Sequence, residues 1–301
     1  MVSRAKLERF ALRGMDIATR RRVRVVAQVL LALALIFAAT RLRSTWHDSS
    51  QQLYGVAWQW LFGALVLGLC ATVWSSLVWL EILRRLGARP RAWWAAIFLQ
   101  AQLAKYVPGS IWHYAGRGVL ARDRGLPLRA VGVSLPVELA ASLCGALAFV
   151  VLLAGWPGLI GVAAAIGLLA AVARRRHGAT GAVPSAAVLY AAAWPLIGAS
   201  FWMTAHAFVD VPADDLAVYT GAFAAAWIVG LVAVYAPGGL GVREAVLVVL
   251  LRGRLGSADA LLVATASRGV FTVVDLIAAG AGAVALKRFG ARVPYDDATA
   301  N

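Results

Sequence analysis

The chain is a succession of apolar runs, each about as long as a membrane is thick, separated by short polar links. A helix rises about 1.5 Å per residue and must cross about 30 Å of hydrocarbon, so roughly 20 apolar residues make one span. By that measure the sequence predicts spans at 23–40, 56–80, 130–154, 156–173, 184–209, 217–235 and 269–286. The predicted fold class is an all-α polytopic membrane protein with about 7–8 transmembrane helices, two interrupted, re-entrant segments and an internal repeat.

The overall composition excludes a soluble domain and argues against nucleic acid as a partner. Of the 301 residues, 61% are hydrophobic and 14% are charged, and the formal net charge is +15. The arginines stand in short clusters between apolar runs and do not follow one polar face. This distribution is typical of cytoplasmic loops in membrane proteins, where lysine and arginine accumulate.

The charges of the links predict which side of the membrane each one faces. The links Leu83–Arg91, Arg117–Arg129 and Arg174–His177 are rich in arginine and are expected to be cytoplasmic. In contrast, Gly155–Gly158 has no charge and Asp210–Leu216 carries three aspartates, so both are expected to be external. This pattern places the N-terminus in the cytoplasm.

The predicted domain organisation is a single transmembrane domain over 25–289. It follows a basic amphipathic segment, 1–24, expected to lie on the cytoplasmic membrane surface, and precedes a polar tail, 290–301. The basic residues near the C-terminus favour a cytoplasmic end and hence an even number of crossings. Seven clear spans are an odd number, so this expectation requires that one interrupted segment also crosses. The sequence leaves the parity open.

Two stretches combine proline and glycine with nearby charges. They are Lys105-Tyr106-Val107-Pro108-Gly109-Ser110-Ile111-Trp112, within 105–117, and Tyr235-Ala236-Pro237-Gly238-Gly239-Leu240-Gly241-Val242-Arg243-Glu244, at 235–244. Proline removes an amide donor, and glycine adopts conformations that a helix does not use, so each stretch predicts a helix break. Within a bilayer such breaks survive only inside protein or beside a wet cavity, and paired breaks indicate a transporter-type binding site. The alternative is that both are interfacial loops where helices end.

Charged residues beside these breaks predict an anion site. Each charge at mid-bilayer depth costs on the order of 2.5–3.5 kcal/mol, so pairing, water or a charged ligand must compensate it. A half-helix beginning at Ser110 would direct free amides and a positive dipole end into the break, which suits a phosphate. The predicted headgroup-binding residues are Lys105, Tyr106, Ser110, Trp112, Arg117, Gly238, Gly239 and Arg243.

Three carboxylates lie in apolar sequence and are the predicted counterparts of these cations. Glu138, Glu244 and Asp275 are interpreted as counter-ions, contacts for a ligand amine, or proton-carrying groups. The alternative is a set of internal salt bridges with no ligand. If the protein were an enzyme, these carboxylates and His113 would be the candidate catalytic groups, but no catalytic signature surrounds them. We therefore expect no enzymatic activity.

Neither the cysteines nor the histidines predict a metal site or a cofactor. Cys70 and Cys144 fall within apolar spans without a CxxC spacing. The four histidines are scattered and lack ligand spacing, so no metal and no cofactor are predicted.

The motif residues resemble a known family. Lys105-Tyr106-Val107-Pro108-Gly109 with Trp112 and Arg117, then Glu138, then Pro237-Gly238-Gly239-Leu240-Gly241-Val242-Arg243-Glu244 are similar to the membrane region of lysylphosphatidylglycerol synthase/flippase proteins, including the multiple peptide resistance factor. The resemblance covers roughly residues 20–290. It implies a polytopic fold with two re-entrant helix pairs and a lipid-headgroup cavity. Its best-known members move aminoacylated phosphatidylglycerol between leaflets.

The resemblance also implies limits. The chain lacks the soluble aminoacyl-transferase domain of those members, so we expect that it does not make lysylphosphatidylglycerol. Other members resemble partners of enzymes that build polyprenyl-phosphate-linked sugars. The leading hypothesis is a multi-pass flippase of the bacterial inner membrane whose partners are anionic phospholipids or polyprenyl-phosphate lipids. A membrane-bound synthase or glycosyltransferase and a second copy of the chain are further candidate partners. The alternative functions are an accessory scaffold for such an enzyme and a membrane-embedded lipid transferase.

Overall fold

The computed structural model describes residues 55–106, 112–154, 157–175, 182–233 and 239–289. Regular structure in these ranges is helical throughout. The helices are α3 (Trp58–Arg85), η2 (Ala92–Trp94), α4 (Ala95–Ala101), η3 (Gln102–Tyr106), α5 (Trp112–Arg122), α6 (Leu128–Val150), η4 (Val151–Ala154), α7 (Gly158–Arg175), α8 (Ala182–Ala191), α9 (Trp194–His206), η6 (Ala213–Asp215), α10 (Leu216–Val232), α11 (Val242–Leu255) and α12 (Ser257–Phe289). The predicted segments 1–24, 23–40 and 290–301 lie outside the described residues.

Five stretches are long and apolar enough to cross a membrane, which confirms a multi-pass helical membrane protein. They are Trp58–Arg85, Leu128–Leu153, Val183–His206, Ala213–Val232 and Ser257–Phe289. The span predicted at 156–173 forms α7, whose apolar stretch Gly158–Leu168 is shorter than the roughly 20 residues of a full crossing.

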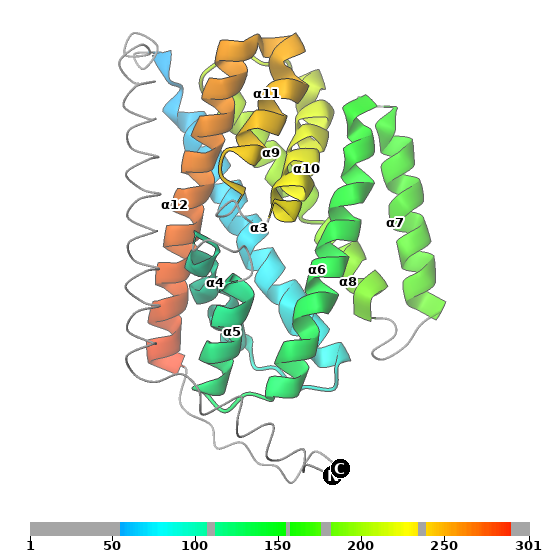
Figure 1. The fold of residues 1–301 in the computed structure, drawn as a ribbon, viewed down its shortest axis with the longest axis vertical. Helices are drawn as coiled ribbons and strands as arrows, with labels where there is room; N and C mark the ends of the chain where they lie inside the picture. Colours follow the sequence, from blue (N-terminus) through cyan, green and yellow to red (C-terminus); the bar gives the residue numbers. More distant parts are fainter. Residues whose placement is uncertain (1–54, 107–111, 155–156, 176–181, 234–238, 290–301) are drawn as a thin grey trace.

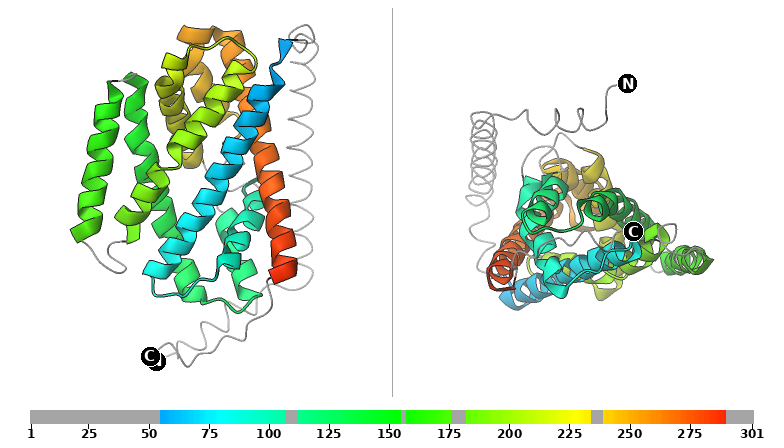
Figure 2. Two further views of the ribbon diagram at one scale, coloured as in Figure 1. Left: turned by 180° about the vertical axis from the view of Figure 1, so that it is seen from behind. Right: turned by 90° about the horizontal axis from the view of Figure 1, so that it is seen from below.

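Long helices run the length of the molecule, and two pairs of shorter helices, α4 with α5 and α10 with α11, lie beside them. Helices α3, α6 and α12 run along the long axis, whereas α4 and α5 occupy the lower half of Figure 1 and α10 and α11 the upper half. The view from behind in Figure 2 gives the same arrangement. The two helices of each pair therefore lie in the same half of the molecule in both Figure 1 and Figure 2.

The charged helix ends separate along the same axis. The C-terminal ends of α3 and α12 lie near the bottom of Figure 1, and they carry the basic pairs Arg84–Arg85 and Lys287–Arg288. At the opposite end, Arg254 donates a 3.2 Å hydrogen bond to Asp215. Basic helix ends of the described residues thus lie at one end of the molecule, whereas Arg254 at the other end is paired with Asp215.

Two helix irregularities open the backbone near the middle. Pro136 lies inside α6, where it removes an intrahelical hydrogen bond. The span predicted as continuous over 184–209 is instead divided into α8 and α9 by a turn at Ala192 and Ala193. Pro195, at the start of α9, explains this break because proline is tolerated in the first turn of a helix and not in its interior.

Close packing between α12 and α4 holds the lower pair in place. A Cβ atom added to Gly282 would stand 2.7 Å from the amide nitrogen of Gln100 and 2.8 Å from the carbonyl oxygen of Ala96, so the two helices meet backbone to backbone. Small residues give this close approach in membranes, where lipid provides no hydrophobic drive between helices. Gly167 in α7, by contrast, faces open space.

Candidate functional site

A cavity with a volume of about 260 Å³ lies between the two short helix pairs and the long helices. Charged side chains from four helices and one 3-10 turn converge on it. They are Lys105 of η3, Arg117 of α5, Glu138 of α6, Arg243 and Glu244 of α11, and Arg268 and Asp275 of α12. The four basic groups exceed the three carboxylates by one, which gives this set a net charge of +1.

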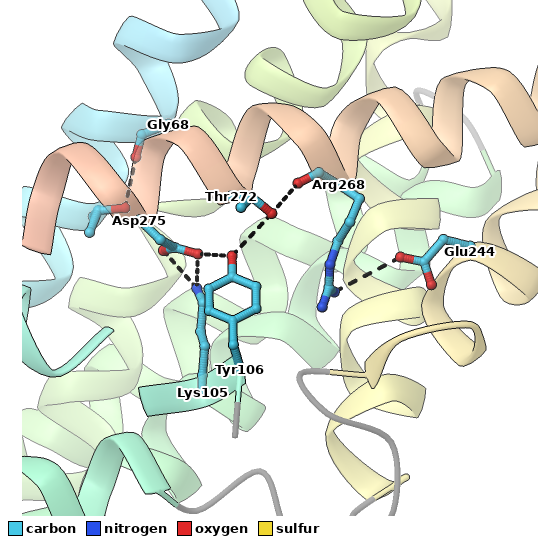
Figure 3. Close-up of polar contacts among 8 residues, drawn as sticks. Gly68, Lys105, Tyr106, Glu244, Arg268, Thr272 and Asp275 are labelled. Atoms are coloured by element: carbon cyan, nitrogen blue, oxygen red, sulfur yellow. Dashed lines mark hydrogen bonds and ion pairs between the residues drawn. The ribbon is translucent and has the colours of Figure 1, made fainter. Parts of the chain in front are cut away.

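Asp275 anchors the residues that precede the first break. Its side chain is 4% exposed, and it accepts a 2.7 Å hydrogen bond from Lys105 Nζ and a 2.6 Å hydrogen bond from the hydroxyl of Tyr106. Figure 3 shows both side chains reaching α12 from the same turn. A buried carboxylate needs such donors, because an unpaired charge in a low-dielectric site is very costly.

Arg268, two turns earlier on α12, faces the second break. Its Nη1 lies 3.9 Å from Oε1 of Glu244, and both side chains are mostly buried. Glu244 also accepts a 2.7 Å hydrogen bond from the amide of Gly241, which caps the start of α11. In Figure 3 the Arg268 guanidinium lies between Tyr106 and Glu244, and it is 5.7 Å from the ring centre of Tyr106. Helix α12 therefore contacts both motifs.

Arg117 and Glu138 form a two-point ion pair that is almost fully closed to solvent. Arg117 Nη1 contacts Glu138 Oε2, and Nη2 donates a 2.9 Å hydrogen bond to Oε1; the side chains are 1% and 7% exposed. The guanidinium lies 4.3 Å from the ring centre of Phe98, 5.0 Å from that of Tyr114 and 5.6 Å from that of Trp79. Cation–π attraction and the two-point contact together compensate the burial of the charge.

Arg243 is the cavity cation that makes no ion pair within the described residues. Among the described residues no carboxylate pairs with it; its guanidinium stands 4.9 Å above the ring centre of Phe223. Its aliphatic stem passes between Gly230 of α10 and Gly239, whose φ is +72°. A Cβ atom at Gly230 would overlap Cγ and Cδ of Arg243, and one at Gly239 would lie 2.9 Å from Cδ. The two glycines thus form a slot that directs the guanidinium to the cavity.

The structure brings most of the predicted site residues together. Lys105, Tyr106, Arg117, Glu138, Arg243, Glu244 and Asp275 all line the cavity. Gly239 is buried behind Arg243, and Trp112 is 41% exposed and is not part of the lining. Ser110, Gly238 and the prolines of both breaks lie outside the described residues, so the predicted half-helix start at Ser110 cannot be placed.

Other functional residues have weaker signals in the sequence. Tyr190 lines the cavity at the end of α8, just before the break that Pro195 produces. Pro195 is the feature of the sequence that could have identified Tyr190 as a cavity residue. The aromatic rings around Arg117 and the slot glycine Gly230 have no comparable signal, because their roles depend on which helices become neighbours.

No known protein family, curated protein or solved structure matches this chain. The cavity itself is therefore the basis for a functional conclusion.

Proposed function

We propose that this protein is a membrane lipid transporter of the flippase type that holds the phosphate of a lipid headgroup in the charged cavity. The observation that carries the proposal is Arg243. Among the described residues it is the one cavity cation without a carboxylate partner, and it faces a cavity between two helix pairs. A planar guanidinium offers two parallel donors to phosphate oxygens, and an anion would bring the charge of the set to zero.

The size of the cavity supports a headgroup and not a whole lipid. Pockets that enclose drug-sized ligands have volumes of about 300–1,000 Å³, and this cavity is slightly smaller. Acyl or polyprenyl chains would have to remain in the bilayer while the headgroup enters the protein. The candidate lipids are an aminoacylated phospholipid, an anionic phospholipid and a polyprenyl-phosphate-linked sugar, in keeping with the family resemblance of the motifs.

The proposal includes an orientation in the membrane. The two short helix pairs act as re-entrant segments entering from opposite sides, within 7–8 crossings that include 23–40. The end that carries the basic pairs of α3 and α12 faces the cytoplasm, as the distribution of lysine and arginine favours. The N-terminus lies on the same side, and the membrane is the bacterial inner membrane.

No chemical step is part of the proposed function. A general base needs a carboxylate or imidazole directed at the reacting group. In the part of the chain that the structure describes, each cavity carboxylate is held by a cation: Glu138 by Arg117, Glu244 by Arg268 and Asp275 by Lys105. This arrangement supports binding and movement of a lipid over bond cleavage.

A translocation assay tests the proposal directly. Full-length protein in proteoliposomes should accelerate leaflet exchange of a fluorescent anionic phospholipid, measured with a membrane-impermeant reductant. Arg243→Ala should reduce the rate by about 10–100-fold, because hydrogen bonds to a charged group contribute about 1.5–3 kcal/mol. Arg254→Ala, on the same helix and outside the cavity, is the matched control and should keep the full rate. Equal exchange with wild type, Arg243→Ala and empty liposomes, for phospholipid and polyprenyl-phosphate probes alike, would exclude the function.

An accessory scaffold for a membrane-bound synthase or glycosyltransferase is the second candidate. It is favoured by the fact that three of the four cavity cations are already paired within the chain. In that case Arg243→Ala should lower the yield of folded protein and leave lipid binding by the surviving fraction unchanged. A variant with normal yield and lost lipid binding would exclude the scaffold.

A further inference from the structure

The ion pairs of the cavity restrict the charge of the ligand. A headgroup ammonium needs a carboxylate, but each of the three cavity carboxylates already neutralises a cation. An incoming amine would displace Lys105, Arg117 or Arg268 and leave that cation buried without its partner. Such an exchange gains nothing, because it only moves the unpaired positive charge. The arrangement therefore favours a ligand with one negative charge and no positive charge.

The wall of the cavity formed by α8, α6 and α3 carries hydroxyl groups. Tyr190 is 7% exposed, and within the described ranges its hydroxyl makes no hydrogen bond of ordinary geometry; its near polar neighbour is the carboxylate of Glu138, which Arg117 already contacts at both oxygens. Buried polar groups are nearly always hydrogen-bonded, and an exception calls for an explanation. A hydroxyl that lines a cavity is explained if a ligand supplies the partner.

The neighbouring hydroxyls are arranged to accept hydrogen bonds. Ser142 of α6 donates to the carbonyl oxygen of Leu139 at 3.1 Å. Thr72 and Ser75 of α3 donate to carbonyl oxygens one turn earlier, each at 2.9 Å. The three hydroxyl protons are thus engaged by backbone carbonyl groups, and the oxygen lone pairs remain available to accept a hydrogen bond. All three side chains line the cavity. With the Tyr190 hydroxyl, this wall complements a group that both donates and accepts hydrogen bonds without carrying charge.

We infer that the cavity selects a phosphate whose substituent is uncharged and hydroxylated, with the phosphate at Arg243 and a hydroxyl of the substituent at Tyr190. This inference rests on the proposed function and specifies its substrate class. Two sources share the chemistry: a phospholipid with a glycerol headgroup and a polyprenyl-phosphate-linked sugar. Tyr190 is the specificity-determining residue, because its hydroxyl contacts the substituent and not the phosphate.

Competition between lipids of different headgroup tests this inference. Full-length protein in nanodiscs is presented with phosphatidylglycerol, phosphatidylethanolamine, phosphatidic acid and a polyprenyl-phosphate hexose, and bound lipid is quantified by native mass spectrometry. Phosphatidylglycerol or the polyprenyl-phosphate hexose should bind at least about tenfold more tightly than phosphatidylethanolamine. Whichever of the two binds more tightly identifies the source.

A matched pair of tyrosine variants isolates the role of Tyr190. Tyr190→Phe should reduce the preference for phosphatidylglycerol over phosphatidic acid by roughly 3–10-fold, which corresponds to one neutral hydrogen bond. Tyr219→Phe is the control, because Tyr219 is also buried with a hydroxyl that lacks a partner among the described residues, but it lies outside the cavity lining. A ratio of two affinities does not change with the folded fraction.

The outcomes separate the inference from the function on which it rests. If phosphatidylethanolamine binds as tightly as phosphatidylglycerol, or if Tyr190→Phe leaves the preference ratio unchanged, the assignment of an uncharged hydroxylated substituent is wrong. Lipid binding that still depends on Arg243 would in that case leave the proposed function standing. If no phosphate-bearing lipid binds, the proposed function fails as well.

Discussion

Arg117 and Arg243 each follow a Pro-Gly stretch by a few residues, yet the structure gives them opposite environments. Arg117 is enclosed by aromatic rings and neutralised by Glu138 at two points. Arg243 has a glycine slot around its stem, one aromatic ring below its guanidinium and no carboxylate partner within the described residues. Arginines that follow two similar motifs are thus a closed ion pair in one half and, in our proposal, the ligand-binding cation in the other.

The comparison shows that the surroundings of a cation, and not its place in a motif, decide its role. A buried charge that a carboxylate neutralises, as Glu138 neutralises Arg117, is stabilising only as part of its pair. A charge on a stem confined by glycines, with no paired carboxylate, retains donors for a ligand. Sequence alone predicts the same role, headgroup binding, for both arginines. The structure separates them, because Arg117 is paired with Glu138 and Arg243 has no carboxylate partner among the described residues; our proposal therefore gives the ligand to Arg243.

The largest effect is expected from breaking the closed pair. Glu138→Ala leaves Arg117 buried without a carboxylate and should lower the free energy of unfolding by about 3–5 kcal/mol. Thermal unfolding of the purified protein in detergent measures this loss. The double variant Arg117→Met with Glu138→Leu should recover most of it, because no charge remains buried. If Glu138→Ala is as stable as the wild type, the description of Arg117 as a structural cross-link is incorrect.

A smaller effect, on binding and not on stability, is expected when the slot for Arg243 is filled. Gly230→Ala places a methyl group where the Arg243 stem passes and should weaken lipid binding about tenfold, or about 1.4 kcal/mol. Gly280→Ala is the control, since a Cβ atom there meets open space in α12.

The coupling between Gly230 and Arg243 gives a second measurement. In an Arg243→Ala background, Gly230→Ala should cause no further loss, because the guanidinium that the slot directs is already gone. Additive losses in the double variant would show that Gly230 acts on the lipid by a route that does not involve Arg243.

The smallest effect is expected from a solvent-exposed ion pair between arginine and glutamate. Arg84 contacts Glu81 through two nitrogens, at 2.7 and 2.8 Å, much as Arg117 contacts Glu138, but the Arg84 side chain is 65% exposed. Exposed pairs contribute little, since water already solvates both charges. Arg84→Ala should therefore leave both the unfolding midpoint and lipid translocation unchanged. A clear drop in either would mean that two-point geometry matters more than burial.

The sequence predicts the helical class and the main spans well, because apolar length is a local property. It also identifies the charges that converge on the cavity, since a charge in an apolar run needs compensation wherever it lies. It cannot identify the partners: Lys105 and Asp275 are 170 residues apart, and their contact depends on how α12 packs beside the lower helix pair. The Arg268–Glu244 pair likewise becomes apparent only when α11 and α12 are placed side by side.

The predicted span at 184–209 is long and apolar enough to cross, but apolar length does not reveal that it is interrupted. Pro195 divides the stretch into α8 and α9. Tyr190 lies at the end of α8 and lines the cavity. A proline inside a predicted span is therefore a local signal for a cavity residue, as Pro136 is for Glu138 in α6.

Because Arg268 and Asp275 belong to one uninterrupted helix, the spacing of their contacts is fixed by helical rise. Seven residues at about 1.5 Å each separate the two attachment points by about 10 Å along α12. The regular backbone of the helix therefore fixes the distance between the two contacts independently of loop conformation. A single residue inserted between the two positions would turn Asp275 by about 100° and detach one motif while the other stayed bound.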